Sequence, residues 1–256
     1  MPLSLGINVV LGYFVFFWSL WFSGISYGFE KDRAILAATL DYPPYEYLED
    51  GQPKGIAVEI IREAVKRTGV NEVVFEFFPW KRAVFLVESG QNDILFNAGK
   101  NQARQQWGYY VDSTLILQKY VLFKKRNKDI EVNPDFSNVK DKSIAVRLGY
   151  LYGSGPFRHA LDEEKFSYVI LSNSTRQSVD LLLGDRVDFF VGDYLPVMHY
   201  IKENALYDRI DIVKESVGSS DNLVVLTWPT YILFSNKKVS LKYVQEVEAV
   251  MNEMKA

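Results

Sequence analysis

The stretch Asp41-Tyr42-Pro43-Pro44-Tyr45-Glu46-Tyr47 follows a short apolar run at residues 34–40 and precedes a helical pattern that begins near residue 56. Each proline fixes φ near about −65° and removes a backbone donor, so the pair holds the chain in an extended turn. The turn carries its tyrosines to the carboxyl end of the expected strand, where open α/β sheets bind ligands. Tyr42 and Tyr45 are therefore candidates for a pocket wall. The alternative is a turn whose tyrosines only cover the core.

Outward from this turn, apolar runs alternate with helical patterns along the chain. Strands are expected at residues 34–40, 73–77 and 93–96, and helices after residue 56 and after Pro79. This β-α-β-α-β order predicts a parallel sheet with helices on its faces. The second half repeats the plan, with strands expected at residues 143–148, 168–171 and 187–191 and helices at 157–161, 175–183 and 193–201.

Two similar α/β units predict a clamshell of two lobes, each a mostly parallel sheet flanked by helices, with hinge strands between them. We expect residues 29–124 to form the first part of lobe 1, residues 125–214 to form lobe 2, and residues 215–256 to return to lobe 1. Hinge closure around a ligand is a known use of this plan. A site between the lobes would bury its ligand on both sides.

The composition excludes several classes of site. The chain has 256 residues, a net charge of −3 and no cysteine. The charge gives no basic footprint, so nucleic acid is not an expected partner. The lack of cysteine excludes disulfides, thiolate metal sites and cysteine nucleophiles. Since the two histidines, His159 and His199, are isolated, no metal and no cofactor is expected.

The first 28 residues differ from the rest, because none of them carries a charged side chain. An apolar and aromatic run at residues 7–22 is followed by Ser26 and Gly28, which fit the small-residue rule for signal cleavage. We expect residues 1–28 to be a signal peptide whose removal delivers the protein to the periplasm. The alternative is a retained membrane anchor, because the run lacks a preceding basic residue and approaches the length of a bilayer span.

Several side chains fall at expected strand ends or helix starts, where a cleft between the lobes would form. Arg104 offers a planar fork of donors for a carboxylate, and Asp193 offers an acceptor for an ammonium group. Tyr42 and Trp80 offer flat faces for stacking or cation–π contact. Together they predict a site for a small polar or zwitterionic ligand. Taken singly, Arg104 also fits a surface charge, and Asp193 also fits a helix N-cap.

The order of these motifs resembles the family 3 extracellular solute-binding proteins, the periplasmic receptors for amino acids and related polar solutes. The resemblance covers about residues 34–254. Three stretches carry it in the first lobe: Tyr42-Pro43-Pro44-Tyr45 with Gly55-Ile56-Ala57-Val58-Glu59-Ile60, Pro79-Trp80-Lys81-Arg82-Ala83, and Gly90-Gln91-Asn92-Asp93. They are similar to the family's aromatic-Pro-aromatic turn with its helix start, to the Pro-Trp-x-Arg variant of one branch, and to its Gly-x-x-Asp motif.

The resemblance implies a type II clamshell of the amino-acid ABC-transporter class, acting by binding and not by catalysis. It assigns Arg104 to the ligand's carboxylate, Asp193 to the ammonium group, and Arg147-Leu148-Gly149-Tyr150 to the second-lobe Gly-Thr turn. The expected ligand-binding residues are Tyr42, Tyr45, Trp80, Arg82, Arg104, Arg147, Tyr150 and Asp193. The expected partner is an ABC permease or a membrane sensor, and the protein is expected to be a monomer.

Two departures from the family pattern fall where the family normally binds the ligand's carboxylate, and two other functions stay open. Tyr150 replaces the usual small hydroxyl residue, and residues 96–100 replace the first-lobe Gly-Met-Thr segment. One alternative is an enzyme on the same scaffold, because the resemblance extends to periplasmic dehydratases of the cyclohexadienyl type and to lytic transglycosylases. Glu46, Glu59 and Asp193 would be the acids available for it. Another alternative is a sensor lobe whose cleft is filled by its own Tyr150 or Trp80.

Overall fold

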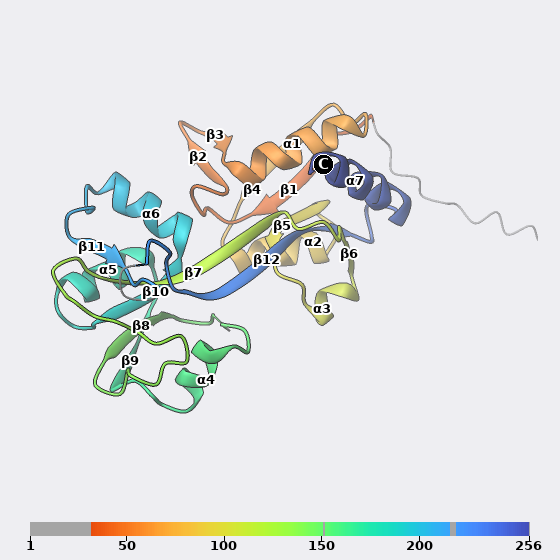
Figure 1. The fold of residues 1–256 in the computed structure, drawn as a ribbon. Coiled ribbons are helices and arrows are strands. Elements are labelled where there is room, and N and C mark those ends of the chain that lie inside the picture. Colours follow the sequence, from red (N-terminus) through yellow and green to blue (C-terminus); the bar gives the residue numbers. More distant parts are fainter. Residues whose placement is uncertain (1–31, 151, 216–218, 256) are drawn as a thin grey trace, which may run out of the picture.

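The computed structural model describes residues 32–150, 152–215 and 219–255. These residues form two α/β lobes joined by two long strands (Figure 1). The expected signal peptide, residues 1–28, lies outside the described residues. Within the described ranges, no helix has both the length and the apolar character that a membrane span requires.

The first lobe contains the strands β1 (Ile35–Thr39), β4 (Val73–Phe77) and β5 (Ile94–Ala98) and the helices α1 (Ile56–Arg67), α2 (Trp80–Glu88) and α7 (Leu241–Glu253). The strands are parallel, and β1 lies between the other two. Ala37 of β1 packs in the core with α1 and α7, whereas Ala38 packs in the core with α2. Successive side chains of a strand point to opposite faces, so burial on both faces explains the unbroken apolar run of β1.

The second lobe contains the strands β8 (Ser143–Arg147), β9 (Tyr168–Ser172) and β10 (Phe189–Asp193) and the helices α4 (Pro156–Asp162), α5 (Thr175–Leu183) and α6 (Tyr194–Glu203). The strands are again parallel, with β8 in the middle. Ser174 begins α5 by accepting a hydrogen bond from the Gln177 backbone, and Pro156 occupies the first turn of α4. Helices α5 and α6 pack on one face of the sheet and α4 packs on the other.

Two long antiparallel strands, β7 (Ile116–Lys125) and β12 (Val224–Ser235), connect the lobes. β12 pairs with β5 and β7 pairs with β10, giving the strand order β4-β1-β5-β12-β7-β10-β8-β9. Figure 1 shows both strands passing from one lobe to the other. The expected two-lobe fold with hinge strands is therefore confirmed. The local apolar pattern predicts strands only at residues 120–123 and 231–234, and β7 and β12 extend beyond both ranges. In β12 the pattern is interrupted by Pro229.

The remaining short elements are β2 (Tyr47–Glu49), β3 (Gln52–Lys54), α3 (Gln102–Gln105), β6 (Gly108–Tyr110) and β11 (Ile210–Ile212). The hairpin β2–β3 projects from the first lobe toward α6 (Figure 1), and the rings of Tyr47 and His199 lie 6.1 Å apart. The hairpin therefore brings the two lobes into contact.

Each lobe has its own hydrophobic core, and each hinge strand contributes side chains to both. In β7, Ile116 packs in the first-lobe core and Tyr120 in the second-lobe core. In β12, Trp228 packs against the second-lobe core and Ile232 packs in that of the first lobe. The lobe boundaries expected at residues 124 and 214 stay predictions.

Candidate ligand-binding site

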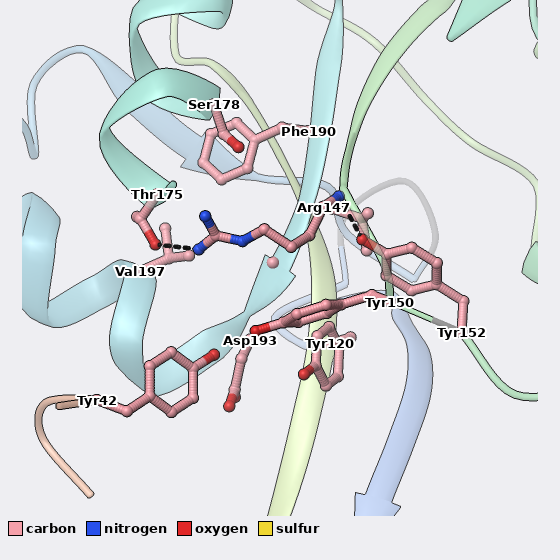
Figure 2. Close-up of a pocket in the computed structure, with 12 residues that line it drawn as sticks. Tyr42, Tyr120, Arg147, Tyr150, Tyr152, Thr175, Ser178, Phe190, Asp193 and Val197 are labelled. Atoms are coloured by element: carbon pink, nitrogen blue, oxygen red, sulfur yellow. Dashed lines mark hydrogen bonds between the residues drawn. The ribbon is translucent and has the colours of Figure 1, made fainter. Parts of the chain in front are cut away.

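A small pocket lies where the first lobe, the hinge strand β7 and the second lobe meet (Figure 2). Its empty volume is about 310 Å³ when the open solvent at its mouth is counted, but only about 20 Å³ is open to the centre of a water molecule. The residues that line it are Tyr42, Tyr120, Arg147, Tyr150, Tyr152, Thr175, Ser178, Phe190, Val191, Gly192, Asp193 and Val197. Tyr42 comes from the turn after β1, Tyr120 comes from β7, and the others belong to the second lobe. The pocket thus sits at the carboxyl ends of β1, β8 and β10, as expected for this sheet topology.

Asp193 is the buried acid of this pocket. It ends β10 and stands at the N-cap position of α6, but its side chain does not cap the helix. Its Oδ1 accepts a hydrogen bond from the Tyr45 hydroxyl at 3.0 Å, whereas its buried Oδ2 has no hydrogen-bond partner among the described residues. Burial raises the pKa of Asp193 from 3.8 to about 7, and the hydrogen bond from Tyr45 opposes part of this rise. The Leu195 and Lys119 backbone N–H groups and the Tyr42 hydroxyl also lie near enough to lower it, but none of them meets hydrogen-bond geometry with Oδ2. A cation beside Oδ2 would relieve the cost of ionisation.

The bond between Tyr45 and Asp193 joins the two lobes. The Tyr45 ring is 1% exposed and packs in the first-lobe core, while Asp193 belongs to the second lobe. The turn that carries Tyr45 is held against α1, because the Tyr45 carbonyl accepts a bond from the Ala57 backbone at 2.9 Å. Gly55 permits this close approach, since it has a φ of +119° and a Cβ there would strike the Tyr45 carbonyl. Tyr45 does not line the pocket, but it anchors Asp193.

Arg147 and the tyrosines form the opposite part of the pocket. The Arg147 side chain donates through Nη2 to Thr175 Oγ1 at 3.2 Å, and its Cζ lies 5.8 Å from the ring centre of Tyr150. The Arg147 backbone N–H donates to the Tyr152 hydroxyl at 2.7 Å, which fixes the turn after β8. The ring of Tyr150 also contacts that of Tyr120, with centres 6.4 Å apart. This corner therefore presents a guanidinium group among aromatic rings.

Four of the expected binding residues lie in the first lobe and do not line the pocket, namely Tyr45, Trp80, Arg82 and Arg104. Arg104 donates through Nη1 to the Gly99 carbonyl at 2.9 Å, and its Cζ lies 5.3 Å from the ring centre of Trp80. Arg82 is exposed, with its Cζ 5.4 Å from the Phe78 ring centre. The structure brings Tyr42, Arg147, Tyr150 and Asp193 together in one pocket, with Tyr45 bonded to Asp193. The roles assigned to all eight residues stay predictions.

A second buried acid, Glu46, stands behind the pocket in the first lobe. Its Oε1 accepts a bond from Asn97 Nδ2 at 2.7 Å, while its Oε2 has no hydrogen-bond partner among the described residues. Burial raises the pKa of Glu46 well above its ordinary value of 4.5. Asn97 in turn accepts a bond from Thr230 Oγ1 at 2.6 Å, so the network reaches hinge strand β12. By contrast, Glu59 is exposed on α1 and pairs with Arg62.

Sequence reasoning missed Tyr120 and Thr175, both of which line the pocket. For Tyr120 the structure supplies what the sequence did not: Gln118 and Tyr120 are buried, while Leu117 and Lys119 are exposed. That alternation indicates an inward-facing polar row on a strand. Thr175 had no signal of its own, since it follows an ordinary Ser174 N-cap. Among the described residues, no group of three His, Asp or Glu side chains is arranged to hold a metal ion.

The comparison with known families decides the class of this protein. Residues 35–256 match the pattern of the bacterial extracellular solute-binding proteins, family 3. The chain belongs to this family. The expected family resemblance and the solute-binding role are thereby confirmed, while the Pro-Trp-x-Arg branch stays a prediction. No curated protein sequence matches the chain.

Solved structures of similar fold include other binding proteins. An ancestral arginine-binding protein bound to arginine has a TM-score of 0.65 and 18% identity, over 88% of this chain and 94% of that one. The substrate-binding protein of an amino acid ABC transporter has a TM-score of 0.60 and 19% identity, over 87% of this chain and 93% of that one. A histidine kinase sensor domain with similarity to periplasmic binding proteins has a TM-score of 0.66 and 18% identity, over 88% of this chain and 91% of that one. At these identities the likeness establishes a shared fold.

Proposed function

We propose that this family 3 protein captures a small solute with a protonated amino group by closing its two lobes over the pocket. Asp193 receives the cation, and the rings of Tyr42 and Tyr120 supply the surrounding walls. The protein acts by binding, without catalysis. In the family 3 pattern the solute is an amino acid or a related compound, and the neighbours that bind arginine and glutamine support this class.

One observation carries the proposal: the buried Oδ2 of Asp193 has no hydrogen-bond partner among the described residues, and it lies in a pocket between lobes. Burying an ionised carboxylate without a partner costs free energy, and a protonated carboxyl would leave its O–H donor without an acceptor. An ammonium group would remove that cost and add a charge-assisted hydrogen bond. The bond from Tyr45 of the opposite lobe to Oδ1 supports closure around this same carboxylate.

Tyr150 bears on the alternative of a cleft filled by its own side chains. Its ring lies in the pocket between Tyr120 and Arg147 and takes up part of the space. However, its exposed fraction is 38%, so it sits at the mouth and can turn outward. A pocket filled for structural reasons would be expected to satisfy its buried acid, and the unpartnered oxygen of Asp193 therefore favours a ligand.

The class of protein supports two kinds of downstream partner. The likeness to a substrate-binding protein of an ABC transporter supports delivery to a permease, and the likeness to a histidine kinase sensor domain supports signalling. Both roles use the same closed, loaded clamshell, acting as a monomer in the periplasm. Closure bends β7 and β12, and the proposed lobes are residues 29–124 with 215–256, and residues 125–214.

Thermal unfolding of the full chain tests the proposal. The protein is screened against α-amino acids, polyamines and small carboxylates without an amino group. A ligand present at 100 times its dissociation constant stabilises the protein by roughly 2.7 kcal/mol, which raises the melting temperature by about 5–10 °C. We expect compounds with an amino group to give this shift and simple carboxylates to give none.

Asp193→Asn then tests the residue, because the amide keeps the shape but cannot balance a cation. We expect it to weaken binding about 10- to 100-fold, the equivalent of one charge-assisted hydrogen bond. The matched control is Asp180→Asn, at an exposed position on α5. The proposal is wrong if no amine stabilises the protein, or if Asp193→Asn binds the amine as tightly as the wild type.

A further inference from the structure

We propose that Arg147 and Thr175 of the second lobe bind the carboxylate of the solute, so that one lobe holds both ends of a zwitterion. The inference rests on the proposed function, because it adds an anionic end to a ligand whose amino group meets Asp193. The two residues line the same pocket as Asp193, and Figure 2 shows the Arg147 side chain extending to Thr175 above Asp193 and Tyr42.

The guanidinium group of Arg147 has donors to spare. It is half-buried, and its side chain makes a single hydrogen bond to the described part of the chain, to the neutral hydroxyl of Thr175 at 3.2 Å. No carboxylate among the described residues lies within ion-pair distance of it. An arginine side chain has five N–H donors in a planar fork, the geometry that grips a carboxylate with two parallel bonds. Thr175 supplies a hydroxyl that can turn to donate to the same carboxylate.

Asp193 does not use these donors, although it lines the same pocket. An ion pair with Arg147 would occupy Oδ2, which instead has no hydrogen-bond partner among the described residues. Such a pair would also lower the pKa of Asp193, whereas burial holds it at about 7. The pocket therefore presents a positive and a negative group that do not neutralise each other. A ligand with an amino group and a carboxylate complements both.

Arg104, the residue expected from the family pattern, is engaged elsewhere. Its guanidinium stacks on Trp80 and donates to the Gly99 carbonyl, which also accepts a bond from the Tyr110 hydroxyl at 3.0 Å. It does not line the pocket. Both arginines lie against an aromatic ring, but Arg104 donates to a backbone carbonyl outside the pocket, whereas Arg147 lines the pocket and donates to the Thr175 hydroxyl at 3.2 Å.

The test compares pairs of ligands that differ only in the carboxylate. Calorimetry on the full chain first identifies the tightest binder among the twenty common α-amino acids, and then measures the amine formed by removing its carboxylate. The wild type is expected to prefer the amino acid by about 10- to 100-fold. Arg147→Gln is expected to lose that preference by weakening the amino acid alone, with the amine bound within about twofold of wild type.

Two further variants separate this role from a structural one. Arg147→Lys keeps the charge but loses the planar fork, so it should retain part of the preference. Arg186→Gln is the matched control at an exposed position of the same lobe, and it should bind both ligands as the wild type does. If Arg147→Gln does not fold, as judged by its circular dichroism, Arg147→Lys alone decides.

The contrary outcomes are distinct. A wild type that binds the amine and the amino acid equally overturns this inference and leaves the proposed function intact. The same holds if Arg147→Gln or Arg147→Lys weakens both ligands by the same factor, or if Arg104→Gln, in place of the Arg147 variants, removes the preference. A wild type that binds neither ligand overturns the proposed function and this inference together.

Discussion

Asp193 illustrates, at the scale of one residue, how the fold changes the chemistry of a side chain. An aspartate in water has a pKa of about 3.9, but burial raises that of Asp193 to about 7. Its carboxyl group is therefore partly protonated near neutral pH in the empty pocket. The proposed cation would lower this pKa again, so that binding releases protons and strengthens as the pH rises toward 7.

Asp193 is expected to make the unliganded protein less stable as the pH rises from about 4 to about 7. Its pKa is higher in the folded state than in the unfolded chain, so the folded state binds more protons in this window, and its advantage falls as protons leave. The full effect on the free energy of unfolding is on the order of 4 kcal/mol, reached above pH 7. Urea unfolding of wild type and Asp193→Asn measures it as a difference that grows through this window and is constant above it.

The control for this pH series is Asp180→Asn, which removes a carboxyl at an exposed position on α5 of the same lobe. Burial raises the pKa of Glu46, and the charge of Asp193 adds to that rise, so Asp193→Asn also removes the part that Asp193 contributes. A difference between wild type and Asp193→Asn that does not change between pH 4 and pH 8 would contradict the raised pKa of Asp193.

At the scale of elements, the turn after β1 is the part that positions the site. It holds Tyr42 at the pocket and Tyr45 on Asp193, and it is pressed against the start of α1 at Gly55. The sequence predicted this turn and its place at a strand end, because proline and apolar periodicity are local signals. It did not predict the length of β7 and β12, because strand pairing between residues far apart overrides the local effect of Pro229.

Gly55→Ala is expected to destabilise the protein by about 1–3 kcal/mol. The added Cβ would strike the Tyr45 carbonyl, and alanine disfavours a φ of +119°. Because the turn must shift, the Tyr45 hydroxyl should also move away from Asp193 and ligand affinity should fall. Urea unfolding measures the first effect and calorimetry the second.

Gly51→Ala is the matched control for this prediction. Gly51 also has a positive φ, of +74°, but it lies at the tip of the β2–β3 hairpin with no atom within 4 Å of an added Cβ. Gly51→Ala should lower the free energy of unfolding only by the backbone strain, roughly 1–2 kcal/mol, and leave ligand affinity unchanged. Equal losses of both stability and affinity in the two variants would mean that the contact between Gly55 and Tyr45 has no special role.

At the scale of the whole molecule, the protein consists of two lobes whose relative position depends on few contacts. The hinge strands connect the lobes covalently. Across the cleft, the lobes contact each other through the hydrogen bond from Tyr45 to Asp193 and through the rings of Tyr47 and His199. Such contacts can shift an equilibrium between open and closed forms by their own free energy and no more.

Tyr45→Phe is expected to open the unliganded protein. The phenylalanine ring keeps the packing in the first-lobe core, but the hydrogen bond to Asp193, worth about 1.5–3 kcal/mol, is lost. The closed population should fall about 10- to 100-fold relative to the open one. Small-angle X-ray scattering should record a larger radius of gyration, which returns toward the wild-type value with saturating ligand. Identical scattering from the unliganded proteins would show that this bond does not hold the lobes together.

The sequence by itself determined the family, the two α/β units and the carboxyl-end position of the site. It could do so because apolar periodicity, turn residues and motif order are properties of neighbouring residues. Only the tertiary structure decided which candidates meet: Tyr42, Arg147, Tyr150 and Asp193 share one pocket, while Arg104 lies against Trp80. The physical reason is that a pocket is assembled from distant segments, and each long side chain points toward whichever partner the packing of both lobes brings within reach.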